Sequence, residues 1–190
     1  AIMGRVCYHP CENACNRGLL DESVGINSVE RFLGDQALKY RWTMEAGEDT
    51  GKKVMIIGAG PAGLSAAYHL TRLGHQVEIH EAGPVAGGMM AVGIPKYALP
   101  SDILANEIKT IEKMGVIIKT GVCFGVDITL EDLKEDDVDA VFLGLGLHGS
   151  RRLGVEGEDA QGVIPGIEFL RDVALGKEVK LGEKNIVVGG

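Results

Sequence analysis

The chain has 190 residues, of which 45% are hydrophobic and 24% charged, proportions typical of a globular protein that buries a sizeable core. Its formal net charge is −8 and it has no basic stripe, which argues against a nucleic-acid-binding surface. No apolar run approaches the roughly 18 residues of a membrane span, and no signal peptide is visible, so a cytoplasmic location is predicted.

Residues 1–50 are predicted to be a separate unit, because they carry closely spaced thiols. Three cysteines recur at intervals of four residues, at Cys7, Cys11 and Cys15. Pro10 predicts a helical turn on which the second and third thiols share one face. Three such thiols suit a soft metal, but an iron–sulfur cluster takes four ligands. A zinc site that uses His9 and a set of buried structural thiols are the alternatives.

An amphipathic helix is predicted over residues 26–40, with Asn27 or Ser28 as its N-cap. Glu30 lies on this helix and by itself is typical of a solvated acid. Residues 41–53 are polar and are predicted to be a linker.

The strongest motif in the chain begins with the apolar run Val54–Ile57 and continues as Gly58-Ala-Gly60-Pro-Ala-Gly63. This spacing predicts a strand that turns tightly into a helix, whose N-terminal N–H groups point at a pyrophosphate. A second strand, residues 76–80, ends in Glu81, at the distance where an acid meets the ribose hydroxyls of a dinucleotide.

Further elements of an α/β fold follow in order. Residues 82–100 are predicted to be a long functional loop that carries Gly87-Gly88, and Ser101 is predicted to cap a helix that runs to about Met114. The remaining predictions are a strand at 116–119, a core thiol at Cys123, a capping box at 129–132, a strand at 138–143 and a helix at 165–174. Gly144-Leu-Gly146 follows the last of these strands, at a second sheet edge where a cofactor can be contacted.

Residues 184–190 resemble the start of the first glycine motif and predict a second strand-to-glycine turn. Because the chain stops inside this turn, we expect it to be a fragment of a longer protein. The predicted domains are therefore the thiol unit and linker (1–50), the first part of a dinucleotide-binding domain (51–150), and a connection into a truncated second dinucleotide-binding domain (151–190), to which the family resemblance described next assigns FAD and NAD(P)H respectively.

The motifs GRVC, CENAC, GAGPAG, EAGPVAGG, GIPKYALP and IVVGG together resemble the small (β) subunit of NADPH-dependent glutamate synthase and its relatives, including the amino-terminal half of dihydropyrimidine dehydrogenase. The resemblance covers nearly the whole chain. It implies an α/β fold of the glutathione-reductase type, with two dinucleotide-binding domains preceded by a small helical iron–sulfur domain.

The resemblance also implies roles for individual residues. Cys7 and Cys11 match ligands of one [4Fe–4S] cluster and Cys15 a ligand of another, while Glu30 matches a position where relatives supply an oxygen ligand. The family's other cluster cysteines lie upstream of GRVC, so neither cluster is fully ligated by this chain. The matched FAD contacts are Val6, Gly58, Gly60, Pro61, Ala62, Gly63, Glu81, Gly88 and Met89. Ala98 stands where the family often has arginine.

The predicted function is therefore that of an FAD-dependent NAD(P)H oxidoreductase subunit that passes electrons through iron–sulfur clusters to a larger amidotransferase subunit. No side chain is predicted to act as a catalytic base or nucleophile. The alternatives are an electron-input subunit for a different partner, such as a pyrimidine reductase or a ferredoxin-linked complex, and a non-catalytic electron-relay module.

Overall fold

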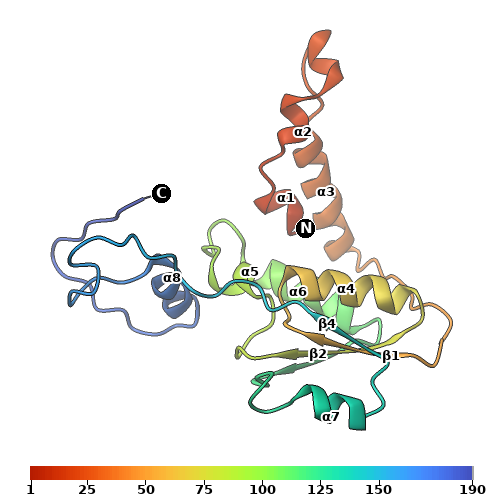
Figure 1. The fold of residues 1–190 in the computed structure, drawn as a ribbon. Coiled ribbons are helices and arrows are strands. Elements are labelled where there is room, and N and C mark those ends of the chain that lie inside the picture. Colours follow the sequence, from red (N-terminus) through yellow and green to blue (C-terminus); the bar gives the residue numbers. More distant parts are fainter. Residues whose placement is uncertain (190) are drawn as a thin grey trace.

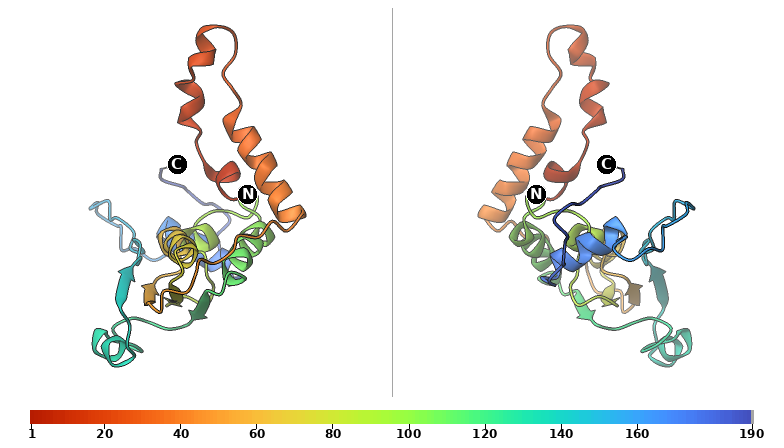
Figure 2. Two further views of the ribbon diagram at one scale, coloured as in Figure 1. Left: turned by 90° about the vertical axis from the view of Figure 1, so that its right-hand side faces the viewer. Right: turned by 90° about the vertical axis from the view of Figure 1, so that its left-hand side faces the viewer.

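The computed structural model describes residues 1–189 and has three parts (Figure 1). A helical arm formed by the first forty residues stands off an α/β unit, and a tail with one helix extends from that unit at the left of the view. Figure 2 shows the arm projecting from the α/β unit in both side views. Within residues 1–189, no helix is long and apolar enough to cross a membrane.

The α/β unit is built on one sheet of four parallel strands, in the order β3-β2-β1-β4. The strands are β1 (Lys53–Ile57), β2 (Gln76–Glu81), β3 (Ile117–Thr120) and β4 (Ala140–Leu143). Lys53 is in register with Gln76, and Val54 with Ala140. The chain thus moves outward from β1 to β3 and then returns to the other side of β1, which makes the carboxyl ends of β1 and β4 a topological switch point.

Helices cover both faces of this sheet (Figure 1). The helices of this unit are α4 (Pro61–Arg72), α5 (Met89–Val92), α6 (Ser101–Glu112) and α7 (Leu130–Glu135). The alternation of side chains along the strands separates two clusters. Val54, Ile56 and Ile79 pack with α4 and α6, whereas Met55 and Ile57 pack with Leu133 of α7. Burying one such side chain contributes about 1.5–3 kcal/mol.

The arm consists of three short helical turns folded back on one long helix. Its elements are α1 (Met3–Val6), α2 (Pro10–Asn13), a 3-10 turn (Asn16–Leu19) and α3 (Ile26–Lys39). Gly4 lies against the backbone of Arg31, and Arg5 pairs with Asp35 at 2.7 Å. Ile2 and Val6 pack against the core of the α/β unit, which ties the arm to it.

Several helix ends differ from the prediction. Helix α3 begins at Ile26, so neither Asn27 nor Ser28 caps it; instead Glu12 of α2 accepts from the N–H of Asn27 at 2.7 Å. Ser101 is the first residue of α6 and makes no capping bond, because Pro100 occupies the cap position. Cys15 lies beyond the end of α2, so it does not share a helical turn with Cys11.

Two other predictions are wrong in part. The loop at 82–100 contains the single turn α5, and residues 184–188 form no strand. Ile186, Val187 and Val188 are largely exposed, since no strand within residues 1–189 pairs with them. The last helix, α8 (Gly166–Ala174), and the capping box of Thr129 and Asp132 form as predicted.

Candidate functional site

The glycine turn joins the end of β1 to the start of α4. Gly58 has a φ of +102°, and its N–H donates to the carbonyl of His80 at 2.7 Å, which holds the turn to β2. A Cβ on Gly58 would overlap the carbonyl oxygen of Gly144, and a Cβ on Gly63 would overlap the carbonyl oxygen of Gly58. These two glycines are therefore required by packing within the protein itself.

Gly60 has a different role, because packing within the protein leaves room for a side chain at this position. A Cβ on Gly60 would meet only the Cα of Gly88, at 3.9 Å. Pro61 begins α4, and no side chain caps the N-terminus of this helix. Free N–H groups and the positive end of the helix dipole are therefore presented beside Gly60, which suits a phosphate that approaches the backbone closely.

Glu81 ends β2 and faces this turn. Its Oε2 accepts from the N–H of Ala59 at 2.7 Å, and its Oε1 accepts from the N–H of Gly83 at 2.7 Å. A carboxylate has about four lone-pair positions, so each oxygen keeps capacity for a further donor. The two backbone bonds thus orient Glu81 for a ligand that offers hydroxyl groups.

The second glycine loop closes over the first. Gly88 has a φ of +53°, and a Cβ there would lie 2.7 Å from the Cα of Gly60. The N–H of Gly87 donates to the carbonyl of Ala59 at 2.8 Å, so the two loops are joined through their backbones. Only glycine at position 88 permits this approach.

These segments enclose a cleft at the carboxyl ends of β1, β2 and β4. Its lining comprises Gly58, Gly60, Pro61, Ala62, Glu81, Gly88, Met89, Leu143, Gly144, Leu145, Gly146, Leu147 and His148. The cleft has a volume of about 250 Å³. In open α/β sheets, ligands bind in the crevice outside the carboxyl ends of the strands where the strand order reverses, which is where this cleft lies.

Two predicted cofactor contacts lie outside this cleft. Gly63 is buried behind Gly58, and Val6 is partly buried against the core of the α/β unit. The sequence prediction also missed residues of the cleft. Leu147 and His148 line the cleft directly after the predicted edge Gly144-Leu-Gly146, and the signal that identifies them is their position beside Gly146, just after a strand.

The proposed metal ligands remain apart from one another in the arm. Cys7, Cys11 and Glu30 are exposed, and Cys15 is half-buried. Hydrogen bonds from the backbone N–H groups of Val24 and Arg17 lower the pKa of Cys15. Among residues 1–189, no group of three His, Cys, Asp or Glu side chains lies close enough to hold a metal ion.

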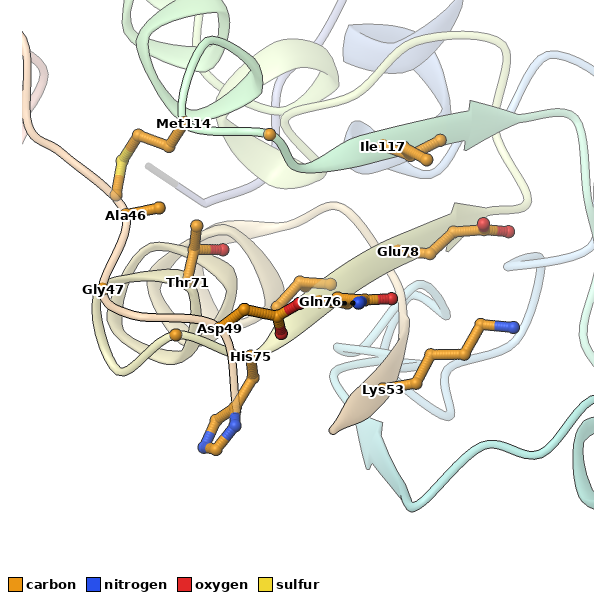
Figure 3. Close-up of a pocket in the computed structure, with 13 residues that line it drawn as sticks. Ala46, Gly47, Asp49, Lys53, Thr71, His75, Gln76, Glu78, Met114 and Ile117 are labelled. Atoms are coloured by element: carbon orange, nitrogen blue, oxygen red, sulfur yellow. Dashed lines mark hydrogen bonds between the residues drawn. The ribbon is translucent and has the colours of Figure 1, made fainter. Parts of the chain in front are cut away.

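A larger hollow, of about 330 Å³, lies at the opposite end of the sheet (Figure 3). It is formed where the linker before β1 meets the turn between α4 and β2, and Asp49 accepts there from Gln76 at 3.4 Å. Lys53 and Glu78 extend along its open side. Its greater size does not make it the dinucleotide site, because it is at the amino ends of the strands and has no glycine turn that faces an uncapped helix.

The parallel sheet, the glycine turn and the acid at the end of β2 define an α/β protein of the FAD/NAD(P)-binding type. The sequence matches the pyridine nucleotide-disulphide oxidoreductase family over residues 52–190. The chain belongs to this family, which confirms the predicted α/β dinucleotide-binding fold. The helical iron–sulfur domain predicted to precede it stays a prediction.

Relatives of known name match the arm as well as the α/β unit. The chain is 49% identical over 215 residues to the NADP(+)-dependent formate dehydrogenase subunit beta of Moorella thermoacetica, covering 100% of this chain and 30% of the relative. It is 44% identical to the NADPH-Fe(3+) oxidoreductase subunit beta of Geobacter sulfurreducens, covering 100% of this chain and 29% of the relative. It is 41% identical to the glutamate synthase [NADPH] small chain of Escherichia coli, covering 89% of this chain and 36% of the relative.

Solved structures show the same fold. FprA of Mycobacterium tuberculosis in complex with NADPH has a TM-score of 0.57 and 25% identity, over 64% of this chain and 28% of that one. A 2-naphthoyl-CoA reductase has a TM-score of 0.56 and 26% identity, over 75% and 20%. The chain spans about a third of the length of the curated relatives named above. The predicted resemblance to the glutamate synthase small subunits is confirmed.

Proposed function

We propose that this chain is the front part of an NADPH-linked flavoprotein subunit that feeds electrons into a larger complex. The observation that carries the proposal is the cleft at the switch point, in which Gly60, Glu81 and Gly88 meet the uncapped N-terminus of α4. Relatives named as β subunits and small chains of NADPH-linked enzymes support it.

The residues of the cleft fit a flavin dinucleotide. Gly60 leaves open the space that a Cβ would fill, and Glu81 offers carboxylate oxygens that are already oriented by two backbone bonds. Pro61, Ala62 and Gly63 would present the helix N-terminus to the pyrophosphate, while Gly88, Met89 and Gly146 would line its path. A flavin bound by these residues would supply the link between two-electron hydride transfer and one-electron transfer.

The chain's own contribution to the reaction is binding and orientation. No acid or base of the cleft is needed to transfer a proton in this scheme, because the cofactors carry the chemistry. The apolar residues Leu143, Leu145 and Leu147 would exclude water from one wall of the cleft.

The arm is proposed to supply part of the electron path. Cys7 and Cys11 would serve one [4Fe–4S] cluster and Cys15 another, with Glu30 as an oxygen ligand. The backbone donors that lower the pKa of Cys15 favour the thiolate, which is the form that binds iron. Because iron–sulfur clusters need four ligands each, the remaining ligands would come from outside this chain.

Two partners are compatible with this role. The first is a glutamate synthase large subunit of the amidotransferase type. The second is the catalytic subunit of another NADPH-linked complex, and the full coverage of this chain by the formate dehydrogenase and Fe(3+) oxidoreductase β subunits favours it. In both cases we propose a cytoplasmic location.

Reduction of a dye by NADPH tests the proposal, with the full-length gene product that contains this chain. We expect turnover with an artificial electron acceptor, and we expect the variant Gly60→Val to lose both FAD and turnover, since its side chain would fill the space beside the helix N-terminus. A wild-type protein that binds FAD but is not reduced by either nicotinamide would mean that the chain belongs to a non-catalytic relay. Mass spectrometry of the copurified partner separates the two complexes.

A further inference from the structure

The linker between the arm and β1 is attached to the α/β unit through its backbone. The N–H of Gly47 donates to the carbonyl of Thr71 at 3.0 Å, and the N–H of Thr50 donates to the carbonyl of Gly74 at 3.0 Å. The hydroxyl oxygen of Thr50 also lies 3.2 Å from the carbonyl oxygen of Gly74 and 2.7 Å from Nδ1 of His75. The linker therefore runs along the turn that joins α4 to β2, beside the hollow shown in Figure 3.

Two glycines allow this contact to be very close. A Cβ on Gly74 would lie 1.7 Å from the carbonyl oxygen of Glu48, and a Cβ on Gly47 would lie 2.5 Å from the carbonyl oxygen of Arg72. Linkers that only connect two units are exposed and make few contacts with either unit. The packing of backbone on backbone here instead fixes the linker in place.

The arm is also attached at a second place, near its first residues. Ile2 and Val6 pack against the core of the α/β unit, and Cys7 follows Val6 directly. Within the arm, Arg5 pairs with Asp35 at 2.7 Å, which joins α1 to α3. A body held at two separate points keeps one direction, whereas a body held at one point can swing. The linker is therefore the attachment that sets the direction of the arm.

We propose that the linker is a clamp that holds the thiol arm at a fixed distance from the cofactor cleft, with Gly47 and Gly74 as positioning residues. This inference rests on the proposed function, in which NAD(P)H delivers two electrons to a flavin in the cleft and these leave one at a time through the arm. The rate of such a transfer falls steeply as the separation of the two centres grows. Neither glycine lines the cleft, so the clamp affects transfer into the arm and leaves FAD binding and flavin reduction unchanged.

The test is the variant Gly74→Ala in the full-length gene product, with Gly115→Ala as the matched control. Both glycines follow a helix and have a positive φ, +87° and +106°, but a Cβ on Gly115 meets nothing within 4 Å. Both variants strain the backbone, and only Gly74→Ala pushes the linker away. We expect hydrogen exchange at the amides of residues 46–50 to become roughly tenfold faster in Gly74→Ala, because two backbone hydrogen bonds weaken, and to stay unchanged in Gly115→Ala.

The functional readout separates two steps in an anaerobic stopped-flow experiment with NADPH. In Gly74→Ala we expect the flavin bands to bleach at the wild-type rate and the iron–sulfur absorbance to bleach more slowly, whereas Gly115→Ala should match the wild type in both. Faster exchange at residues 46–50 with an unchanged rate of iron–sulfur bleaching would overturn the inference. Unchanged exchange in Gly74→Ala would overturn it as well.

Thr50→Val is a milder second variant that decides the matter if Gly74→Ala does not fold. Valine has nearly the shape of threonine but loses the hydroxyl contacts with Gly74 and His75. We expect it to change exchange and iron–sulfur bleaching in the same directions by smaller amounts, and wild-type behaviour in both would contradict the clamp. A wild-type protein without flavin or without iron instead refutes the proposed function, and exchange at residues 46–50 still tests the clamp in that case.

Discussion

Gly63 lies where α4 crosses the end of β1, and its hydrogen is directed at the carbonyl of Gly58. The Gly63→Ala variant has to move the helix away from the sheet, because the new methyl group would overlap that oxygen. We expect a loss of about 1–3 kcal/mol in stability, together with loss of FAD, measured by chemical denaturation and flavin content.

Gly166→Ala is the matched control for this variant. Gly166 begins α8, has open space around it and needs no positive φ, so alanine there should be neutral or stabilise slightly. Equal stability of the two variants would show that the close crossing of α4 over β1 is unimportant.

The variant Glu81→Gln tests whether the acid at the end of β2 contributes to FAD binding. In Glu81→Gln one oxygen is replaced by an NH₂ group, which cannot accept from either Ala59 or Gly83, so one backbone donor loses its partner. We expect FAD affinity to fall at least about tenfold, because the carboxylate proposed to bind the ribose is lost and the loop before Gly83 loosens. Calorimetric titration of FAD measures it, and unchanged affinity would exclude Glu81 from the site.

At the scale of elements, Glu78 links two neighbouring strands. Its Oε1 accepts from Lys119 of β3 at 2.7 Å and lies 2.6 Å from Nε2 of His80. Burial raises the pKa of Glu78, but the hydrogen bonds from Lys119 and His80 outweigh it and the net pKa is lowered. The carboxylate is therefore held in its charged form by the β2–β3 pair.

The sign of the pH effect follows from this lowered pKa. A carboxyl with a lower pKa in the folded state stabilises the fold above its unfolded pKa of about 4.3, and that contribution disappears as the pH falls through the folded value. Glu78→Gln should therefore be less stable than the wild type at neutral pH, by about 1 kcal/mol, and should approach it in acid. Urea denaturation at several pH values measures this, with the exposed Glu135→Gln as control; a difference that does not shrink in acid would refute the link.

The capping box of α7 makes a second prediction for an element. The hydroxyl of Thr129 accepts from the N–H of Asp132, and the Asp132 carboxylate accepts from the N–H of Thr129 at 2.7 Å. Thr129→Ala should cost about 1 kcal/mol, since the cap positions Leu133 beneath the sheet. Thr129→Ser should keep most of that stability, and equal losses in both variants would assign the effect to the methyl group instead of the cap.

The sequence predicted the elements whose signals are local. The β1 turn, the α7 capping box and α8 each depend on residues within one short window, and they form as predicted. The cap of α3 was missed because Glu12 reaches it from another helix, and the strand at 184–188 was wrong because a strand depends on a neighbour distant in sequence. His148 was missed for a similar reason: its place in the cleft depends on how β4 pairs with β1.

At the scale of the whole molecule, the chain spans about a third of the curated relatives that it matches. We therefore expect the 190 residues alone to lose FAD during gel filtration, whereas the full-length gene product keeps it. Flavin absorbance of the eluted protein measures this, and stoichiometric FAD on the isolated chain would contradict the expectation.

The most direct test of the central claim is an anaerobic absorbance spectrum of the full-length gene product, recorded before and after addition of NADPH and then NADH, together with iron and sulfide analysis. We predict flavin bands that bleach with NADPH over a broad iron–sulfur background. A protein that is colourless, or that contains zinc and no iron, would contradict the account of an electron-input subunit.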